Sequence, residues 1–406
     1  MPLRSIRWLR RLRGRTIRHI TVFTLALLLI EFLDELTFGV REAAWPLIRD
    51  DLNLDYSQVG ILLGLPNLAS TFIEPLIGIL GDVWRRRVLV LGGGVLFGLA
   101  LLLTALSQHF LVLLASFILL YPASGAFVSL SQATLMDTDP TRHEQNMARW
   151  TFAGSLGVVA GTFSVVAGSW LGVDWRTLFL LLAGLSFLLV MLAWRSPFPR
   201  PQQDDEEEAL TLRQGIAGAF NALRRREVLL WLTLLQFSDF MLDILLGFLA
   251  LYFVDVVGVG PEIAALAITI WTVVGLLGDF LLIPLLERVR GLNYLRISAA
   301  AVLLLYPAFL LVPDLWPKMA LLALLGLFNA GWYAILQGQL YSSMPGRSGS
   351  VMAVSNIYGL VGGLLPIGFG WLAERYDLAA VMWLLALGPL ALLVGIPRQS
   401  QDRPPA

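Results

Sequence analysis

The chain has 406 residues, of which 57% are hydrophobic and only 14% are charged, whereas an average soluble domain is about 25% charged. So few charges exclude a set of soluble domains of this length. Equal numbers of basic and acidic residues, 29 of each, give no overall basicity that would favour nucleic acid as a partner. We therefore predict an all-α integral membrane protein.

The first span follows a strongly basic segment. Seven arginines occupy the first 18 residues, and an apolar stretch then runs from Ile20 to Trp45. A signal peptide would end after a short apolar region at a small-residue cleavage site, so we expect this stretch to remain as a span. Apolar runs and the Gly, Pro and charged breaks between them predict twelve spans, near residues 19–42, 57–80, 88–106, 110–135, 147–171, 176–194, 227–253, 262–286, 294–312, 318–340, 350–373 and 379–396.

Basic residues predict the orientation. With the N-terminus inside, only five of the 29 basic residues fall on outer segments, namely Arg41, Arg49, Arg176, Lys318 and Arg375. Short loops rich in Lys and Arg stay on the cytoplasmic side. The sequence therefore predicts a multi-pass protein of the plasma (inner) membrane with both termini in the cytoplasm.

An internal duplication relates the two halves of the chain. A gapless shift of 205 residues aligns scarce polar, Gly and Pro residues over five spans, including Asp34 with Asp239, Glu74 with Asp279, and Gln132 with Gln337. We expect two pseudo-symmetric six-helix bundles, residues 1–195 and 226–406, joined by a cytoplasmic linker over 196–225. Transporters built from such repeats bind their solutes near the bilayer midplane.

Carboxylates lie where lipid is expected. Glu31 comes about eleven residues after Ile20, which places it roughly 16 Å into a core of about 30 Å. A charge there costs about 2.5–3.5 kcal/mol on the insertion scale, so these acids must face protein or water, or take up protons. Polar residues at helical spacing predict one shared cavity, walled by Glu31, Asp34, Glu35, Asn67, Ser70, Thr71, Glu74, Ser124, Gln132, Gln236, Asp239, Asp243, Thr269, Thr272, Asp279, Asn329, Tyr333 and Gln337.

Two points about this cavity stay open in the sequence. The amides and hydroxyls can equally be hydrogen-bonding contacts between helices. Arg41, the basic side chain near the cavity mouth, can pair with Glu42 or with Asp34. A carboxyl group in a poorly hydrated cavity can exchange a proton near neutral pH or bind a cation, and both properties suit coupled transport.

The loop after the second span carries a motif. It reads Gly78-Ile-Leu-Gly81-Asp82-Val83-Trp84-Arg85-Arg86-Arg87 and resembles the signature loop of the major facilitator superfamily, G-x-x-x-D-R-x-G-R-R. Val83 and Arg85 depart from that pattern. The resemblance implies the twelve-helix fold of this family, and it implies that Asp82 and Arg86 latch the two halves in the outward-facing state. Arg87 and Glu287, the acid of the mirrored loop, complete the predicted gating set; the alternative is that the arginines only set orientation.

Glycines recur in the fifth span as Gly154-x-x-Gly157-x-x-x-Gly161. The run is faintly similar to the antiporter motif of the same family, although its proline is missing and Pro366 stands at the mirrored position. Small residues at this spacing let helices approach closely, and we interpret the run as a packing motif.

These features predict a secondary active transporter and no enzyme. The chain has no phosphate-binding glycine loop that would indicate ATP as the energy source, and we expect no cofactor and no metal site. The favoured function is proton-coupled efflux of a small cationic or amphipathic compound by a functional monomer, with the substrate, protons and lipid as partners and no nucleic acid. The alternatives are proton symport of a polar solute such as a sugar, a receptor or lipid scramblase on the same scaffold, and a magnesium-dependent prenyltransferase built on Asp239-x-x-x-Asp243.

Overall fold

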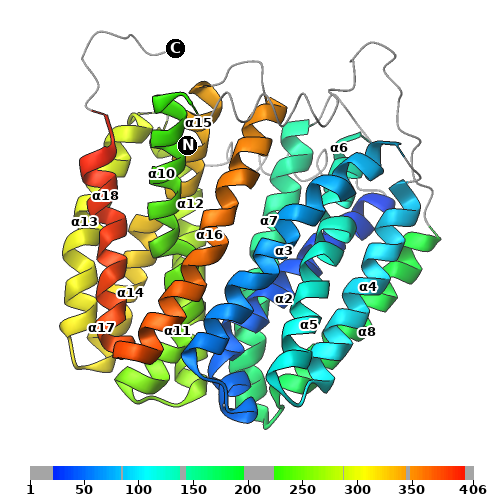
Figure 1. Cartoon of the computed structure of the whole chain (residues 1–406), viewed down its shortest axis with the longest axis horizontal. Coiled ribbons are helices and arrows are strands. Elements are labelled where there is room, and N and C mark those ends of the chain that lie inside the picture. The colour runs from blue at the N-terminus through cyan, green and yellow to red at the C-terminus, as the bar shows by residue number, and fades with distance from the viewer. Residues whose placement is uncertain are drawn as a thin grey trace, which may run out of the picture.

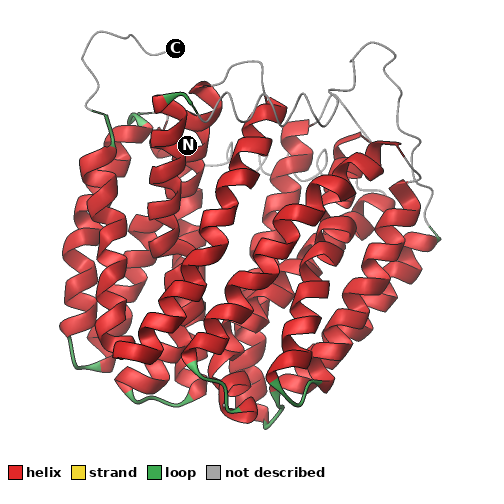
Figure 2. Cartoon of the chain, in the orientation of Figure 1, coloured by secondary structure: helices red, strands yellow, loops and turns green. Residues whose placement is uncertain are grey.

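The computed structural model describes residues 22–83, 86–137, 143–195, 224–286, 288–343 and 348–397. Every regular element among these residues is helical (Figure 2). Nine helices of the described segments are long and apolar enough to cross a membrane. The all-α membrane fold is therefore confirmed, while the total of twelve crossings and the cytoplasmic termini stay predictions.

The helices form two groups that lie side by side (Figure 1). The N-terminal group contains α2 (Val22–Leu52), α3 (Tyr56–Val83), α4 (Arg86–Leu106), α5 (Phe110–Ser124), the π-helical turn η2 (Gly125–Ser129), α6 (Leu130–Asp137), α7 (His143–Leu171) and α8 (Trp175–Trp194). The C-terminal group contains α10 (Arg226–Asp239), the π-helical turn η4 (Phe240–Ile244), α11 (Leu245–Tyr252), the π-helical turn η5 (Phe253–Val257), α12 (Pro261–Leu286), α13 (Gly291–Leu311), α14 (Leu315–Asn329), α15 (Trp332–Ser343), α16 (Ser348–Tyr376), α17 (Leu378–Met382), the 3-10 turn η6 (Trp383–Ala386) and α18 (Leu387–Gly395).

The first span is longer than predicted. The sequence places its end near residue 42, but α2 continues through Pro46 to Leu52. Trp45 and Ile48 are fully buried in the core, so this last part of the helix packs inside the N-terminal group. The charges at 41 and 42 that suggested an end bind each other within the helix.

The tenth span is broken, although the sequence predicted one continuous helix over 318–340. α14 ends at Asn329, and Gly331, with φ +73, connects it to α15. Only glycine adopts this left-handed backbone without strain. The break begins at Ala330, 205 residues after Gly125, where η2 starts in the N-terminal group. Both halves therefore interrupt the regular helix at equivalent positions of the repeat.

Glycines set the closest helix contacts. In α7, Gly157 and Gly161 lie against the backbone of α2, and a Cβ at either position would collide with a carbonyl oxygen of that helix. This confirms the interpretation of the 154–161 run as a packing motif. Between the two groups, a Cβ built on Gly60 of α3 would lie 2.5 Å from the carbonyl oxygen of Pro366 in α16. The backbones of α3 and α16 therefore touch directly.

Candidate functional site

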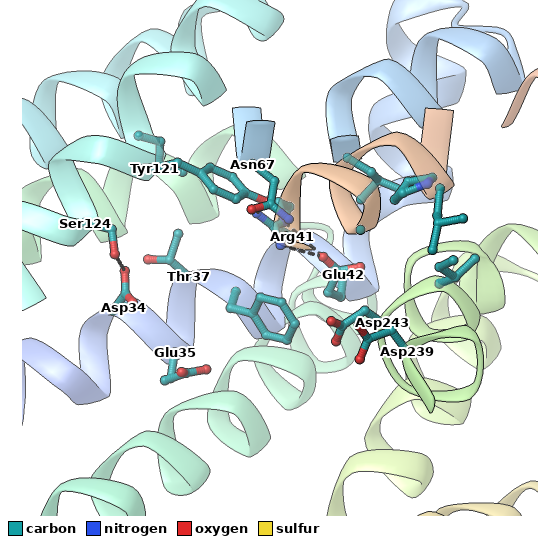
Figure 3. Close-up of a pocket in the computed structure, with 18 of the residues that line it drawn as sticks. Asp34, Glu35, Thr37, Arg41, Glu42, Asn67, Tyr121, Ser124, Asp239 and Asp243 are labelled. Atoms are coloured by element: carbon teal, nitrogen blue, oxygen red, sulfur yellow. Dashed lines mark hydrogen bonds and ion pairs between the residues drawn. The ribbon is translucent and has the colours of Figure 1, made fainter. Parts of the chain in front are cut away.

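A cavity of about 400 Å³ lies between the two groups of helices. Its size falls at the lower end of the range for pockets that bind small molecules. The polar side chains in its wall come from five elements, α2, α3, α5, α10 and η4 (Figure 3). They are Asp34, Glu35, Thr37, Arg41, Glu42, Asn67, Glu74, Tyr121, Ser124, Gln236, Asp239 and Asp243.

A buried ion pair is part of the cavity wall. The Arg41 guanidinium donates from Nε and Nη2 to Oε1 of Glu42, at 3.0 and 2.7 Å, and from Nη1 to the Tyr121 hydroxyl at 2.7 Å. It also lies over the rings of Phe38 and Tyr121, at 5.1 and 5.4 Å from their centroids. Of the two partners that the sequence left open for Arg41, the structure shows Glu42. All three guanidinium nitrogens are therefore engaged within the protein.

Asp34 and Glu35 line the part of the cavity formed by the N-terminal group. The hydroxyl of Ser124 in α5 donates to Asp34 Oδ1 at 2.8 Å. Figure 3 shows Asp34 and Glu35 on successive positions of α2, away from Arg41. Glu74 of α3 also lines the cavity, and its Oε1 accepts a hydrogen bond from Ser70 at 2.5 Å.

Asp239 and Asp243 line the opposite wall, in the C-terminal group. Asp239 is the last residue of α10 and Asp243 lies within the π-helical turn η4, and both lie toward Glu42 of α2 (Figure 3). The Gln236 side chain donates from Nε2 to Asp239 Oδ2 at 3.1 Å. Carboxylates from the two groups thus meet across the cavity.

Glu31 does not line this cavity, although the sequence predicted that it would. Its side chain is buried between α2 and α7, with 8% of the residue exposed. A Cβ built on Gly154 would lie 2.6 Å from Glu31 Oε1. A side chain at 154 would have to displace this carboxyl group, which lies one turn of α2 from the cavity residues Asp34 and Glu35.

The predicted polar residues of α12 and α14 lie outside the cavity. An Asp279 carboxylate oxygen accepts a hydrogen bond from the backbone N–H of Gly331 at 2.9 Å. The Asn329 side chain is buried and donates to the carbonyl oxygen of Met241 at 3.1 Å. Asp279 therefore binds the backbone at the break between α14 and α15, and Asn329 joins the end of α14 to η4. Thr269 and Thr272 donate to carbonyl oxygens of their own helix.

The remaining predicted cavity residues are also found elsewhere. Tyr333 is 57% exposed on α15, and Gln337 and Gln132 are half-buried on α15 and α6. None of the three lines the cavity. In α3, the Thr71 hydroxyl bonds the carbonyl oxygen of Asn67 in its own helix.

The predicted gating residues are only partly described. Arg86 is the first residue of α4, and Arg87 Nη2 donates to the carbonyl oxygen of Trp194 at 2.5 Å, at the end of α8. Arg87 therefore joins two helices of the N-terminal group. Glu287 and the side chain of Asp82 lie outside the described part of the chain, so their predicted role as a latch stays a prediction.

A second polar cluster, the Arg49 cluster, joins the two groups at the end of α2. Arg49 makes a bidentate ion pair with Asp255 of η5, with its Nη2 2.7 Å from Oδ1 and its Nη1 bonded to Oδ2. The Tyr56 hydroxyl donates to the same Asp255 Oδ2 at 2.5 Å, and the Tyr56 backbone N–H donates to Glu374 Oε2 at 3.0 Å. Together with the α3–α16 contact, this cluster closes the cavity at the Arg49 end.

Sequence reasoning missed the roles of Glu42 and Tyr121. Glu42 lies seven residues after Glu35 and eight after Asp34, so helical spacing places it on the same face, but the sequence analysis treated it only as a partner for Arg41. Tyr121 precedes Ser124 by three residues and shares its face of α5. Helical periodicity alone would have placed both residues on the cavity faces of their helices.

Comparison with known proteins gives the same fold. A bacterial homologue of the human lysosomal transporter Spinster, in an inward-facing and unoccupied conformation, superposes with a TM-score of 0.71 over 94% of this chain and 95% of that chain at 18% identity. The nucleoside transporter NupG superposes with a TM-score of 0.74 over 93% of this chain and 100% of that chain at 16% identity.

Two curated relatives are similar in sequence. The multidrug efflux pump SdrM of Staphylococcus aureus (strain N315) is 26% identical over 298 residues, which span 68% of this chain and 64% of that protein. The probable sulfoacetate transporter SauU of Cupriavidus necator is 25% identical over 421 residues, covering 95% and 96% of the two chains. The family model of the Major Facilitator Superfamily matches residues 27–367. That match covers most of the sequence, and the chain therefore belongs to the Major Facilitator Superfamily of transporters.

Proposed function

We propose that this protein is a proton-coupled efflux transporter for a small cationic or amphipathic compound. The observation that carries the proposal is the charge of the cavity. Six carboxyl groups line it, at Asp34, Glu35, Glu42, Glu74, Asp239 and Asp243, against the single guanidinium of Arg41. Because that guanidinium is paired with Glu42, five acids are left to balance a bound cation or protons.

The same charge pattern separates the candidate substrates suggested by relatives. SdrM is a multidrug efflux pump, and the acid-rich cavity of this chain suits efflux of an organic cation. SauU is a probable transporter of sulfoacetate, an anion. An anion would need free cationic partners, and the nitrogens of Arg41 already bind Glu42 and Tyr121. A cationic substrate is therefore favoured over an anionic one, and over a sugar, which needs no net charge in its site.

Alternating access gives the transport mechanism. The bundles 1–195 and 226–406 rock against each other around the cavity, as in other transporters built from repeats. The Arg49 end faces outward when the positive-inside rule sets the orientation. The contacts of the Arg49 cluster then correspond to an inward-facing conformation in the plasma membrane, with both termini in the cytoplasm.

Protons and substrate compete for the acids of the cavity. A carboxylate that is desolvated and unpaired is costly, so each acid must hold a proton or a cation. Binding of protons from outside releases the cation there, and loss of protons inside prepares the site for the next cation. One proton gradient thereby drives the export of the substrate.

Transport in proteoliposomes tests the proposal. An inside-acidic pH gradient should drive uptake of an organic cation, and an ionophore that collapses the gradient should abolish concentrative uptake. Asp34→Asn should abolish the response to the gradient, whereas Glu227→Gln, an exposed acid in the first turn of α10, should keep it. Uptake that ignores the gradient in the unmodified protein would overturn proton coupling.

A further inference from the structure

Several hydrogen-bond donors of the cavity wall already bind acceptors within the protein. The Thr37 hydroxyl donates to the carbonyl oxygen of Leu33 at 2.8 Å, and the Ser124 hydroxyl donates to Asp34. The Gln236 amide donates to Asp239. Arg41 uses three of its five N–H donors on Glu42 and Tyr121, so the donors without a partner among the described residues are one hydrogen on each Nη of Arg41, one on the Gln236 amide, the Asn67 amide and the Tyr121 hydroxyl proton. Acceptor oxygens dominate the rest of the wall.

Two enclosed acceptor oxygens of the cavity wall have no hydrogen-bond donor among the described residues. Glu42 is 3% exposed, and its Oε2 has no hydrogen-bond partner among the described residues, although Oε1 binds Arg41. Gln236 Oε1 is likewise enclosed and unpartnered. It packs against α16, where a Cβ at Gly362 would come within 3.0 Å of it. An unsatisfied buried oxygen is unfavourable, and both of these oxygens belong to residues of the cavity wall.

The unpartnered acceptors flank one pair of acids. Asp239 lies one helical turn from Gln236 on the C-terminal wall, and Asp243 faces Glu42 across the gap between the two groups (Figure 3). When the acids are ionised, this place combines excess negative charge with oxygens that only accept hydrogen bonds. A group that satisfies both requirements must be cationic and must carry several N–H donors.

We propose that the cavity recognises a protonated amine or guanidinium through its N–H groups, and that Glu42, Gln236, Asp239 and Asp243 form this ammonium subsite. A quaternary ammonium ion has the same charge but no N–H, so it would leave the acceptor oxygens unsatisfied. Sites built to hydrogen-bond a substrate discriminate strongly against analogues that lack the donor. The inference rests on the proposed function and narrows its substrate to cations with N–H donors.

A matched pair of ligands tests the subsite by binding alone. The full-length protein in lipid nanodiscs is titrated calorimetrically at pH 7 with 4-phenylbutylamine and with its N,N,N-trimethyl derivative, which share one tail and one positive charge. We expect the primary amine to bind about tenfold tighter or more, since each hydrogen bond to a charged group contributes about one factor of ten. Asp239→Asn should reduce this preference, whereas Glu227→Gln, on the same helix but exposed, should keep it.

The outcomes separate the subsite from the transport function. Equal affinity for the two ligands, or tighter binding of the quaternary ion, would overturn the ammonium subsite and leave a cation transporter standing. An amine preference that persists in both Asp239→Asn and Gln236→Leu would also overturn it, because the discrimination would then arise elsewhere. Failure of the folded protein to bind either cation would overturn the subsite together with the cationic substrate of the proposed function.

Discussion

Replacing Gly60 by alanine should open the Arg49 end of the protein. The new Cβ would lie 2.5 Å from the carbonyl oxygen of Pro366, where ordinary contacts begin at 3.4 Å, so α3 and α16 must separate by about 0.9 Å. Overpacking of this kind costs about 1–3 kcal/mol. The cost arises only in the conformer in which these helices touch, so the equilibrium should move toward the opposite conformer by about 5- to 150-fold.

The chain has no native cysteine, which makes thiol labelling a direct assay for this change. A single cysteine replaces Asn67 in the cavity wall, and a membrane-impermeant thiol reagent is applied to the Arg49 side. Gly60→Ala should raise the labelling rate by the factor given above. Gly92→Ala is the matched control, because a Cβ there meets no atom within 4 Å. Equal rates in the two variants, with equal thermal stability, would refute the reasoning.

Three further changes have defined outcomes. Asp255→Asn removes the ion pair with Arg49. Loss of this ion pair should make the cysteine at position 67 react faster with the thiol reagent applied to the Arg49 side; an unchanged labelling rate would count against a role of the ion pair in closing that side. Asp174→Ala removes the cap that bonds the Thr177 N–H and should lower the free energy of unfolding by about 0.5–2 kcal/mol. Hydrogen bonds from Thr177 lower the pKa of Asp174, so this difference should be full at neutral pH and fade as acidification passes that lowered pKa; a difference that grows in acid would contradict the assignment. Lys318→Met removes the buried ammonium that bonds three oxygens of neighbouring residues, and the melting temperature should fall by an amount corresponding to about 1–3 kcal/mol; an unchanged melting temperature would refute this role.

Sequence reasoning located the acids of the cavity because the free-energy cost of placing a charged side chain in the bilayer is large. Acids in an apolar span can therefore be expected to face the protein interior. Asp34, Glu35, Glu74, Asp239 and Asp243 all line the cavity, as predicted. Helical periodicity places such residues on one face, and the requirement for water or protein around a charge turns that face inward. These two arguments need no knowledge of how the helices pack.

The errors came from local packing and broken helices. Asn329, Tyr333 and Gln337 were placed on one face by assuming a continuous helix, but the left-handed residue Gly331 interrupts it. Every position after the break is rotated relative to those before it, so periodicity no longer applies. Glu31 was placed in the cavity by its depth and by its helical spacing from Asp34 and Glu35, whereas its carboxyl group lies against Gly154 of α7.

The fit between Glu31 and Gly154 constrains how this protein can vary. The space next to Glu31 Oε1 exists only because position 154 lacks a side chain. Any larger residue there would push the carboxyl group out of its place or force α2 away from α7. Substitutions at the two positions are therefore not independent: a residue with a Cβ at 154 changes where the end of the Glu31 side chain can lie, and its cost depends on how easily that flexible side chain moves.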